Sequence, residues 1–504
     1  MQHAITIGVV AEHDSVHTSS CVSWLDWGNE AFQRARAEHQ PILLALGTSW
    51  CRWSAAMVRE TYDDPTVADL IHERFVPIWV DADRRPDINE RYNLGAWPTT
   101  AFLTPDGHLL GGETYVTADR MSDLLQRVAD TFAAKRHEIS ARAAQSVPAR
   151  VASATTEPDV IIEEWLVDHM LNLFDSEHGG FGTGAKRVHA EAIQFAVDRS
   201  RQGDGALAPI AARTIEAIGW SDLHDPVDGG VYRYCAKRDW TEPSFEKVLD
   251  VNAAVLGLLV DGDDPRVKER AVDLLGYVGR TLIDQSDGGF FVSQYGDESY
   301  YGATTPEERR AFEPPRVDRS VYADGTARMA AAYVRAAHVF NDSSLLEFAV
   351  LSLERVVLDS YERGGGIAHQ VDDSESVRGL LADQVRISSA LLDLYGATDR
   401  DAYLDMAQEL MRYALRRLWD AAPGGGFFDR IVMPDDVGLL REPVKPFAAN
   451  CEAAQVLARL AQITEQPDLR QRAVLTLASQ NVVARGYGVD AAPYVLALRE
   501  LASV

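Results

Sequence analysis

A glycine motif recurs six times in the last two thirds of this 504-residue sequence, and no other feature constrains the fold as strongly. In most copies a run of glycines precedes an aromatic or branched residue. The copies are Gly179-Gly180-Phe181-Gly182, Gly229-Gly230-Val231-Tyr232, Gly288-Gly289-Phe290-Phe291, Gly364-Gly365-Gly366-Ile367, Gly424-Gly425-Gly426-Phe427 and the weaker Gly486-Tyr487-Gly488. Successive copies are 50, 59, 76, 60 and 61 residues apart. Because each step fits a pair of helices, the repeat predicts a toroid or solenoid of helical hairpins.

The segments between these loops show two kinds of helical pattern. Apolar residues recur on one face between Leu404 and Leu418, whereas Val251 to Val260 is apolar on all sides. One-sided helices suit an outer ring and all-round apolar helices an inner ring. Six such hairpins predict an (α/α)6 barrel with the glycine loops at one mouth.

The loop residues Phe181, Phe290 and Phe427 are candidates for ligand contact. Glycine permits a positive φ, so the aromatic residue beside it can face a ligand at the mouth. The alternative is that each loop is only a helix C-cap with a hydrophobic contact.

Before about residue 135 the pattern instead alternates short apolar strands with helices. Strands are predicted at residues 41–46, 75–81 and 99–103, which indicates a small α/β domain. The predicted organisation is therefore an N-terminal tail at 1–20, an α/β domain at 21–139, a helical linker at 140–157 and the barrel at 158–504.

Composition limits the classes of partner and location. The chain has 76 acidic and 49 basic residues, a net charge of −27, so nucleic acid is not an expected partner. Ala253 to Val260 is far shorter than a membrane span, and Ala4 to Ala11 lacks the positive flank of a secretory signal. Four scattered cysteines without zinc-like spacing favour a cytoplasmic location. Since phosphate-loop, dinucleotide and zinc motifs are missing, we expect neither a cofactor nor a metal.

Motifs in both parts of the chain resemble a known family. In the first part they are Trp24-Leu25-Asp26-Trp27-Gly28-Asn29-Glu30-Ala31-Phe32, Cys51-Arg52-Trp53-Ser54, Val80-Asp81-Ala82-Asp83 and Trp97-Pro98-Thr99. In the barrel they are Phe245-Glu246-Lys247, Asn252, Leu381 to Asp383, and Asn450. Together they resemble the spermatogenesis-associated, YyaL-like thioredoxin-domain family over nearly the whole chain. The resemblance implies a thioredoxin-like domain fused to a six-hairpin toroid similar to N-acylglucosamine 2-epimerases and several glycosidases.

The thioredoxin-like domain offers a thiol site made of Cys51, Trp53, Ser54 and Pro98. Cys51 is expected at a helix N-terminus, where the helix dipole favours the thiolate, and Pro98 should be the cis-proline facing it. The family usually has a second cysteine where this chain has Ser54, so dithiol oxidoreductase activity is not expected. Cys51 alone can form a mixed disulfide with a client protein or a small thiol but cannot release it by internal attack. A vestigial, structural role is the alternative.

The barrel mouth offers a second candidate site. Glu246 and Asp250 are four residues apart on a predicted helix, and such a carboxylate pair suits general acid–base catalysis. The alternative pairs Glu246 with an arginine that braces the barrel. His369 and Asp383 are further catalytic candidates. The remaining candidates for substrate binding are Arg233, Tyr234, Trp240, Lys247, Asn252, Asp324 and Asn450.

Departures from the family affect the barrel as well. Ser244 stands where the family has a histidine, and Val231-Tyr232-Arg233-Tyr234 stands where it has Phe-His-Arg-Tyr. Histidine chemistry is therefore in doubt at those two places.

Three functions remain open. The first is a carbohydrate-directed isomerase, epimerase or hydrolase, or a sugar binder, because aromatic, carboxylate and arginine side chains together suit a small sugar ligand. The second is a thiol-dependent protein that acts through Cys51. The third is a non-catalytic scaffold.

Overall fold

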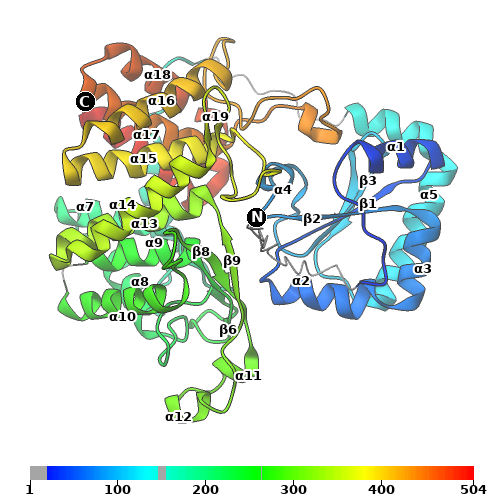
Figure 1. Cartoon of the computed structure of the whole chain (residues 1–504), viewed down its shortest axis with the longest axis horizontal. Helices are drawn as coiled ribbons and strands as arrows, with labels where there is room; N and C mark the ends of the chain where they lie inside the picture. The colour runs from blue at the N-terminus through cyan, green and yellow to red at the C-terminus, as the bar shows by residue number, and fades with distance from the viewer. Residues whose placement is uncertain (1–19, 146–154, 263, 504) are drawn as a thin grey trace, which may run out of the picture. The chain divides into compact units, whose positions relative to one another are not determined.

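The computed structural model describes residues 20–145, 155–262 and 264–503 (Figure 1). The chain forms two compact units. The first contains the described residues up to 145 together with Asp435–Leu439, and the second contains the other described residues. Nearly all of the predicted tail at 1–20, and the middle of the predicted linker at 140–157, lie outside the described residues.

The first unit is built on a four-stranded sheet in the order β2-β1-β3-β4. Its strands are β1 Ile42–Gly47, β2 Val76–Asp81, β3 Thr99–Leu103 and β4 Leu109–Glu113. β1 pairs with β2 in parallel and with β3 antiparallel, and β4 continues antiparallel to β3. The first three match the predicted strands. The sequence did not predict β4, because Leu109–Glu113 is a partly exposed edge strand without apolar alternation.

Helices surround this sheet and give the unit its thioredoxin-like form. They are α1 Asn29–Glu38, α2 Arg52–Met57, α3 Pro65–Arg74, α4 Pro86–Tyr92 and α5 Ala118–Gln145. The apolar side chains Leu43, Ile71, Phe102 and Leu125 belong to one buried cluster. Cys51 lies between the end of β1 and the first residue of α2, so it stands at the N-terminus of that helix.

The second unit is an (α/α)6 toroid, as the glycine repeat predicted. Among its described residues, six helices form a closed inner ring in which each packs against the next. In ring order they are α7 Ala190–Arg201, α9 Leu249–Val260, α13 Ala323–Phe340, α15 Leu381–Thr398, α17 Phe447–Thr464 and α20 Ala492–Ser503. Six outer helices each pack against an inner one. They are α6 Ile162–Leu173, α8 Ala208–Trp220, α10 Pro265–Thr281, α14 Ser343–Ser360, α16 Asp401–Arg417 and α18 Pro467–Ala478.

Burial follows the two helical patterns in the sequence. α9 is buried on nearly all sides, whereas α16 buries one face that includes Tyr403, Ala407 and Met411. Each glycine loop leads from an outer helix to the start of an inner helix. The N-termini of the inner helices therefore share the mouth that carries the loops.

Glycine is required in these loops because of both backbone angle and close packing. Gly230 has a φ of 75°, and a Cβ there would lie 2.4 Å from the Tyr277 ring. Any other residue would be strained in this conformation and would displace the tyrosine.

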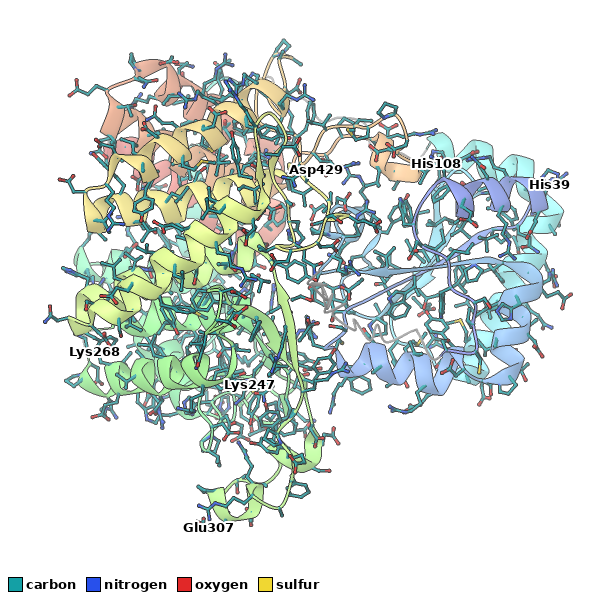
Figure 2. All side chains as sticks on the ribbon, viewed as in Figure 1. His39, His108, Lys247, Lys268, Glu307 and Asp429 are labelled. Carbon is teal, nitrogen blue, oxygen red and sulfur yellow. The ribbon has the colours of Figure 1, made fainter. Side chains whose placement is uncertain are left out.

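An aspartate and a cation close four of the loops. Asp175, Asp225, Asp284 and Asp420 each begin a loop with a backbone hydrogen bond to a glycine carbonyl. Their cationic partners are Lys186 at 2.9 Å, Lys247 at 2.6 Å, Arg355 at 3.0 Å and Lys445 at 2.9 Å. Lys247, labelled in Figure 2, also donates to the Gly229 carbonyl at 2.7 Å. Lys247 thus joins the carboxylate of its loop to the backbone of the same loop.

Side-chain amides from inner helices also hydrogen-bond to the backbone of three loops. Asn252 accepts from the Val231 N–H at 2.9 Å and donates to its carbonyl at 3.1 Å. Asn450 makes the same pair of bonds with Phe427, and Gln384 makes it with Ile367. These amides satisfy loop backbone groups that would otherwise be buried without partners.

Candidate functional site

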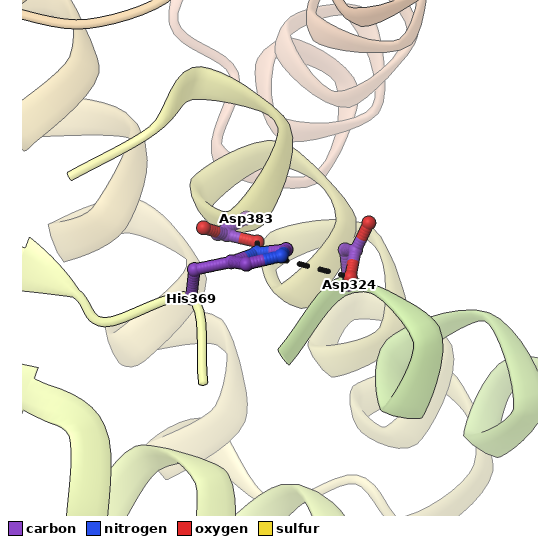
Figure 3. Close-up of side chains that lie close together, drawn as sticks. All are labelled: Asp324, His369 and Asp383. Atoms are coloured by element: carbon purple, nitrogen blue, oxygen red, sulfur yellow. Dashed lines mark hydrogen bonds and ion pairs between the residues drawn. The ribbon is translucent and has the colours of Figure 1, made fainter. Parts of the chain in front are cut away.

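Four titratable side chains meet at the starts of inner helices. Asp250, Asp324 and Asp383 stand in the first turns of α9, α13 and α15. His369 follows strand β11 Gly366–Ile367 in the loop before α15. His369, Asp324 and Asp383 point toward one another (Figure 3).

The His369 ring is held between these carboxylates. Its Nδ1 lies 2.9 Å from Asp383 Oδ1 and 4.0 Å from Asp324 Oδ1. The ring also stacks on Tyr322, with centroids 5.0 Å apart. The side chains of His369 and Asp383 are 5% and 0% exposed, so this hydrogen bond is shielded from water.

Two arginines and a glutamate extend the cluster into the barrel. Arg386 Nη1 donates to Asp324 at 2.6 Å, and Arg386 Nε donates to Glu452 at 3.1 Å. Arg328 Nη2 donates to the other Glu452 oxygen at 3.0 Å. Side chains of α13, α15 and α17 are thereby joined in one ionic network.

Arg328, Arg386 and Glu452 line a cavity of about 290 Å³ at the centre of the barrel. Asp250, Asp324, His369 and Asp383 are not among its described lining residues. All six inner helices contribute to its walls, and Arg328, Arg386, Glu452 and Glu191 are among its polar residues. Its described lining contains no aromatic side chain. A ligand there would be held mainly by hydrogen bonds and charges rather than by ring stacking.

The surroundings move the carboxyl pKa values in opposite directions. Burial raises the pKa of Asp250 and, despite the attraction of His369, that of Asp383. Burial also opposes charge on Asp324, but His369, Arg386 and Arg328 together hold its pKa below the ordinary value. The site therefore combines carboxyls that tend to keep a proton with one that tends to lose it, which is the division of roles that acid–base catalysis uses.

The predicted pair of Glu246 and Asp250 is not on one helix face. Lys247 and Val248 form strand β7, which pairs with β8 Phe291–Gln294 and delays the start of α9 until Leu249. Glu246 is buried and accepts a hydrogen bond from Ser244. Asp250 instead neighbours α13, since a Cβ on Gly325 would lie 3.5 Å from its Oδ1.

Several predicted ligand contacts have structural partners instead. Phe181, Phe290 and Phe427 are at most 8% exposed and pack into the toroid core, so their rings are not open to a ligand as expected. Buried Trp240 donates to the carbonyl of His178. Lys247, Asn252 and Asn450 close the glycine loops as described above, because loop backbone and loop carboxylates need these partners.

Arg233 and Tyr234 lie beside each other in the loop before α9. The guanidinium carbon of Arg233 is 5.6 Å from the centre of the Tyr234 ring, and both residues are partly buried. Neither is among the residues that line the central cavity.

Asp324, His369 and Asp383 also have the composition of a metal site, with ligand atoms within 4.8 Å of one another. However, Asp383 and His369 already share a hydrogen bond, and Asp324 is paired with Arg386. These contacts fit a shared proton and an ion pair without a metal ion, so we treat the set as an acid–base cluster.

Sequence reasoning missed Arg328, Arg386 and Glu452. A signal was present for two of them: Arg328 precedes Met329 and three alanines, and Glu452 stands between Cys451 and two alanines. A charged residue in such a small-residue helix needs either solvent or a polar cavity.

The thiol site has the expected backbone but a buried sulfur. Cys51 is the N-cap of α2 and is 0% exposed, with Sγ 4.0 Å from the Trp97 carbonyl. The Trp97–Pro98 bond is cis. Ser54 is also buried, and its hydroxyl has no hydrogen-bond partner among the described residues. Trp53 is partly exposed and packs edge-on against Tyr115.

We expect Cys51 to react slowly with a small alkylating reagent in the folded protein, because the reagent cannot reach a buried thiol. Cys21 is exposed while Cys51, Cys235 and Cys451 are buried, so mass spectrometry should show about one fast thiol per chain. Cys21→Ser should remove that fast phase, and guanidinium should expose the other three. A fast phase that survives in Cys21→Ser and disappears in Cys51→Ser would instead favour thiol chemistry.

Comparison with known proteins matches both a family model and longer relatives. Residues 12–150 match the family model Thioredox_DsbH, described as a protein of unknown function, DUF255. Spermatogenesis-associated protein 20 from Rattus norvegicus is 28% identical over 325 residues, which cover 58% of this chain and 41% of that protein. The Homo sapiens protein is 27% identical over 324 residues, with the same coverage. The match therefore spans less than half the length of these relatives.

Solved structures match the toroid. D-mannose isomerase aligns with a TM-score of 0.52 at 13% identity over 69% of this chain and 98% of its own. Cellobiose 2-epimerase from Spirochaeta thermophila aligns with a TM-score of 0.52 at 14% identity over 69% and 99%. No described helix has the length and apolar character needed to cross a membrane. These matches confirm the resemblance drawn from the motifs: a DUF255-type thioredoxin-like domain, similar to spermatogenesis-associated proteins, is joined to an (α/α)6 toroid with the fold of sugar epimerases.

Proposed function

We propose that the toroid is a carbohydrate-directed enzyme that isomerises or epimerises a small sugar by proton transfer. The observation that carries this proposal is the contact of buried His369 with Asp383 and Asp324, which Arg386 joins to the central cavity. A histidine oriented by a carboxylate is a suitable general base near neutral pH.

The chemistry needs one base and one acid. His369, whose ring is oriented by its hydrogen bond to Asp383, can take the proton from the sugar carbon beside the carbonyl. Asp250, whose pKa burial raises, can give a proton to the carbonyl oxygen. His369 then returns a proton to the other carbon, which gives the isomer, or to the other face of the same carbon after the enediol has turned in the site, which gives the epimer. An enediol hydroxyl gives its proton back to Asp250 as the carbonyl re-forms.

The similar folds make these reactions the first to test. D-mannose isomerase and cellobiose 2-epimerase share the toroid. At 13% and 14% sequence identity, this similarity shows a common fold and not a common substrate. The substrate is therefore proposed from the chain's own site. The cavity supports a hydroxyl-rich ligand, since arginine, glutamate, glutamine and serine side chains stand among the alanines of its lining.

Incubation of the full chain with a panel of aldoses and ketoses in D2O tests the proposal directly. We expect one sugar to gain deuterium at the carbon beside the carbonyl and to convert to its isomer or epimer, as followed by NMR. Deuterium uptake at that carbon requires proton abstraction and would support the proposal. A panel in which no sugar either exchanges or converts would contradict it.

The opposed pKa values of Asp250 and Asp324 also suit a hydrolase. Release of a new reducing end from a glycoside in the same panel would identify that reaction. Saturable sugar binding without turnover would indicate a binder or scaffold. A thiol function of Cys51 and a cytoplasmic location stay predictions.

A further inference from the structure

Five residues from the loop before α17 belong to the first unit, although the chain on both sides of them belongs to the second. They are Asp435–Leu439, which we call the docking segment. The loop closes at its base, where the Asp429 N–H donates to the Val444 carbonyl at 2.9 Å. The Asp429 carbonyl accepts from the N–H of Leu381, the first residue of α15, at 2.8 Å. The docking segment is thus the middle of a loop whose base is bonded to the toroid.

Side chains of the thioredoxin-like unit bind the backbone of this segment. The Tyr92 hydroxyl, at the end of α4, accepts from the Leu439 N–H at 2.8 Å, and Arg91 Nε donates to the Leu439 carbonyl at 2.8 Å. Asn29, the first residue of α1, donates its amide to the Asp435 carbonyl at 3.2 Å. Because these bonds go to main-chain groups, they recognise the path of the segment rather than its side chains.

Two glycines allow the segment and the unit to approach closely. Gly438 has a φ of 59°, and a Cβ there would lie 2.6 Å from the Tyr92 hydroxyl and 3.1 Å from the Trp27 ring. Gly107, in the turn between β3 and β4, has a φ of 88°, and a Cβ there would overlap the Cα of Gly438. Both the backbone angle and the space at these two positions therefore require glycine.

Tyr92 joins this turn to the segment. Its hydroxyl donates to the Gly107 carbonyl at 2.8 Å while it accepts from the Leu439 N–H. Tyr92 is 0% exposed and Val437 of the segment is 2% exposed. A buried hydroxyl needs such partners, so the segment completes the interior of the unit. These contacts come from α1, α4 and the β3–β4 turn, whereas Cys51 is the N-cap of α2.

We propose that the thioredoxin-like unit is a docking platform for residues 435–439, and that it holds the loop before α17 in one conformation without a redox step at Cys51. The partner that fits this surface is a glycine-containing segment of the same chain. Long loops in compact domains usually have a function, and an anchor in the middle of this one removes conformations that it would otherwise populate. The inference goes beyond the proposed sugar conversion and does not depend on it.

Hydrogen–deuterium exchange of the full chain tests the proposal, measured by mass spectrometry on fragments that cover residues 435–442. In Tyr92→Phe we expect exchange in these fragments to become about tenfold faster, since the Leu439 N–H loses its acceptor. Fragments of β1 and β2 should change clearly less, because only the segment is released. Gly107→Ala and Gly438→Ala should each have a larger effect. Their double variant should add little to either one, because both substitutions break the same contact.

Gly95→Ala and Gly364→Ala are the matched controls for backbone strain. Gly95 in the first unit has a φ of 101° and Gly364 in the toroid has a φ of 82°, but a Cβ at either position would meet no atom within 4 Å. Exchange in residues 435–442 should therefore stay as in wild type in both variants. It should also stay unchanged in Cys51→Ser, which removes the thiol and leaves the docking contacts in place.

The outcomes separate docking from general loss of stability and from thiol chemistry. Unchanged exchange in Tyr92→Phe, or an equal rise in the fragments of β1 and β2, would overturn the docking role. So would a rise in Gly95→Ala as large as that in Gly107→Ala, or a rise in Cys51→Ser as large as that in Tyr92→Phe. If a glycine variant does not fold, Tyr92→Phe decides. The expected changes would support the docking platform even if no sugar is turned over.

Discussion

Asp225→Asn is expected to lower the free energy of unfolding by about 3–5 kcal/mol, the range found when one partner of a buried ion pair is removed. Asp225 is fully buried and lies 2.6 Å from Lys247 and 2.7 Å from Arg309. Asparagine has nearly the same shape, but it leaves buried Lys247 without its carboxylate partner and leaves Arg309 with Asp228 alone, at 3.0 Å. Denaturant unfolding followed by circular dichroism measures the loss.

The pH dependence of this loss follows from the titration of the pair. Although burial opposes its charge, Lys247 and Arg309 hold the pKa of Asp225 below its ordinary value. A depressed pKa adds stability above the unfolded value of about 3.9, and this contribution is lost as the pH falls. Burial also lowers the pKa of Lys247 to about 8, so a neutral Lys247 needs no counter-ion above that pH. The difference in free energy of unfolding between wild type and Asp225→Asn should therefore be largest between about pH 3.9 and pH 8.

Asp284→Asn is the control for Asp225→Asn. Asp284 holds the same place in the next glycine loop and pairs with Arg355 at 3.0 Å, but these side chains are 16% and 10% exposed. Arg355 also pairs with Asp359 and Asp372, and water can partly solvate it, so the loss should be clearly smaller. Equal losses in both variants would mean that the backbone contacts of the loop aspartates, rather than buried charge, dominate.

Much of the fold could be predicted because its signals are local. Paired glycines with positive φ mark the loops, and the contrast between α9 and α16 separates inner from outer helices. The strand β4 could not be found, since an exposed edge strand with two glycines lacks the alternation that identifies strands. The 28 residues of α5 run past the predicted domain end at 139, where no strong stop signal occurs.

The candidate site could be predicted only in part. Asp250 was predicted from its spacing to Glu246, and Asp324, Asp383 and His369 from loops or helix starts near the mouth. Their grouping, however, depends on the order of the inner ring. The sequence placed Glu246 and Asp250 on one helix, because β7 is only two residues long and too short to show the alternating pattern of a strand.

Charged and amide side chains gave the weakest sequence signal. The same residue types serve as structural clamps in Asn252, Asn450 and Lys247 and as cavity residues in Arg386 and Glu452. Only contacts between helices far apart in the sequence distinguish these roles.

His369→Asn is expected to reduce kcat for the proposed sugar conversion by about 10²–10⁴-fold, the usual contribution of a general acid–base group. The asparagine amide can replace Nδ1 in the hydrogen bond to Asp383, so the fold should be retained while the Nε2 position is lost. Steady-state kinetics and the rate of deuterium exchange measure the effect, and thermal unfolding checks the fold. Asp383→Asn should also reduce kcat, because His369 would lose the carboxylate that orients it.

His189→Asn provides the matched control for this substitution. His189 is the N-cap of inner helix α7, and its Nδ1 lies 2.7 Å from Asp490, so the change removes the same atoms from a similar histidine–aspartate pair. α7 lies on the opposite side of the inner ring from α15, separated from it by two helices in either direction. Activity should therefore survive in His189→Asn and fall in His369→Asn. The reverse result would place the base beside α7, and retained exchange in both variants would remove histidine from the mechanism and leave Asp250 and Asp324 as the groups that transfer the proton.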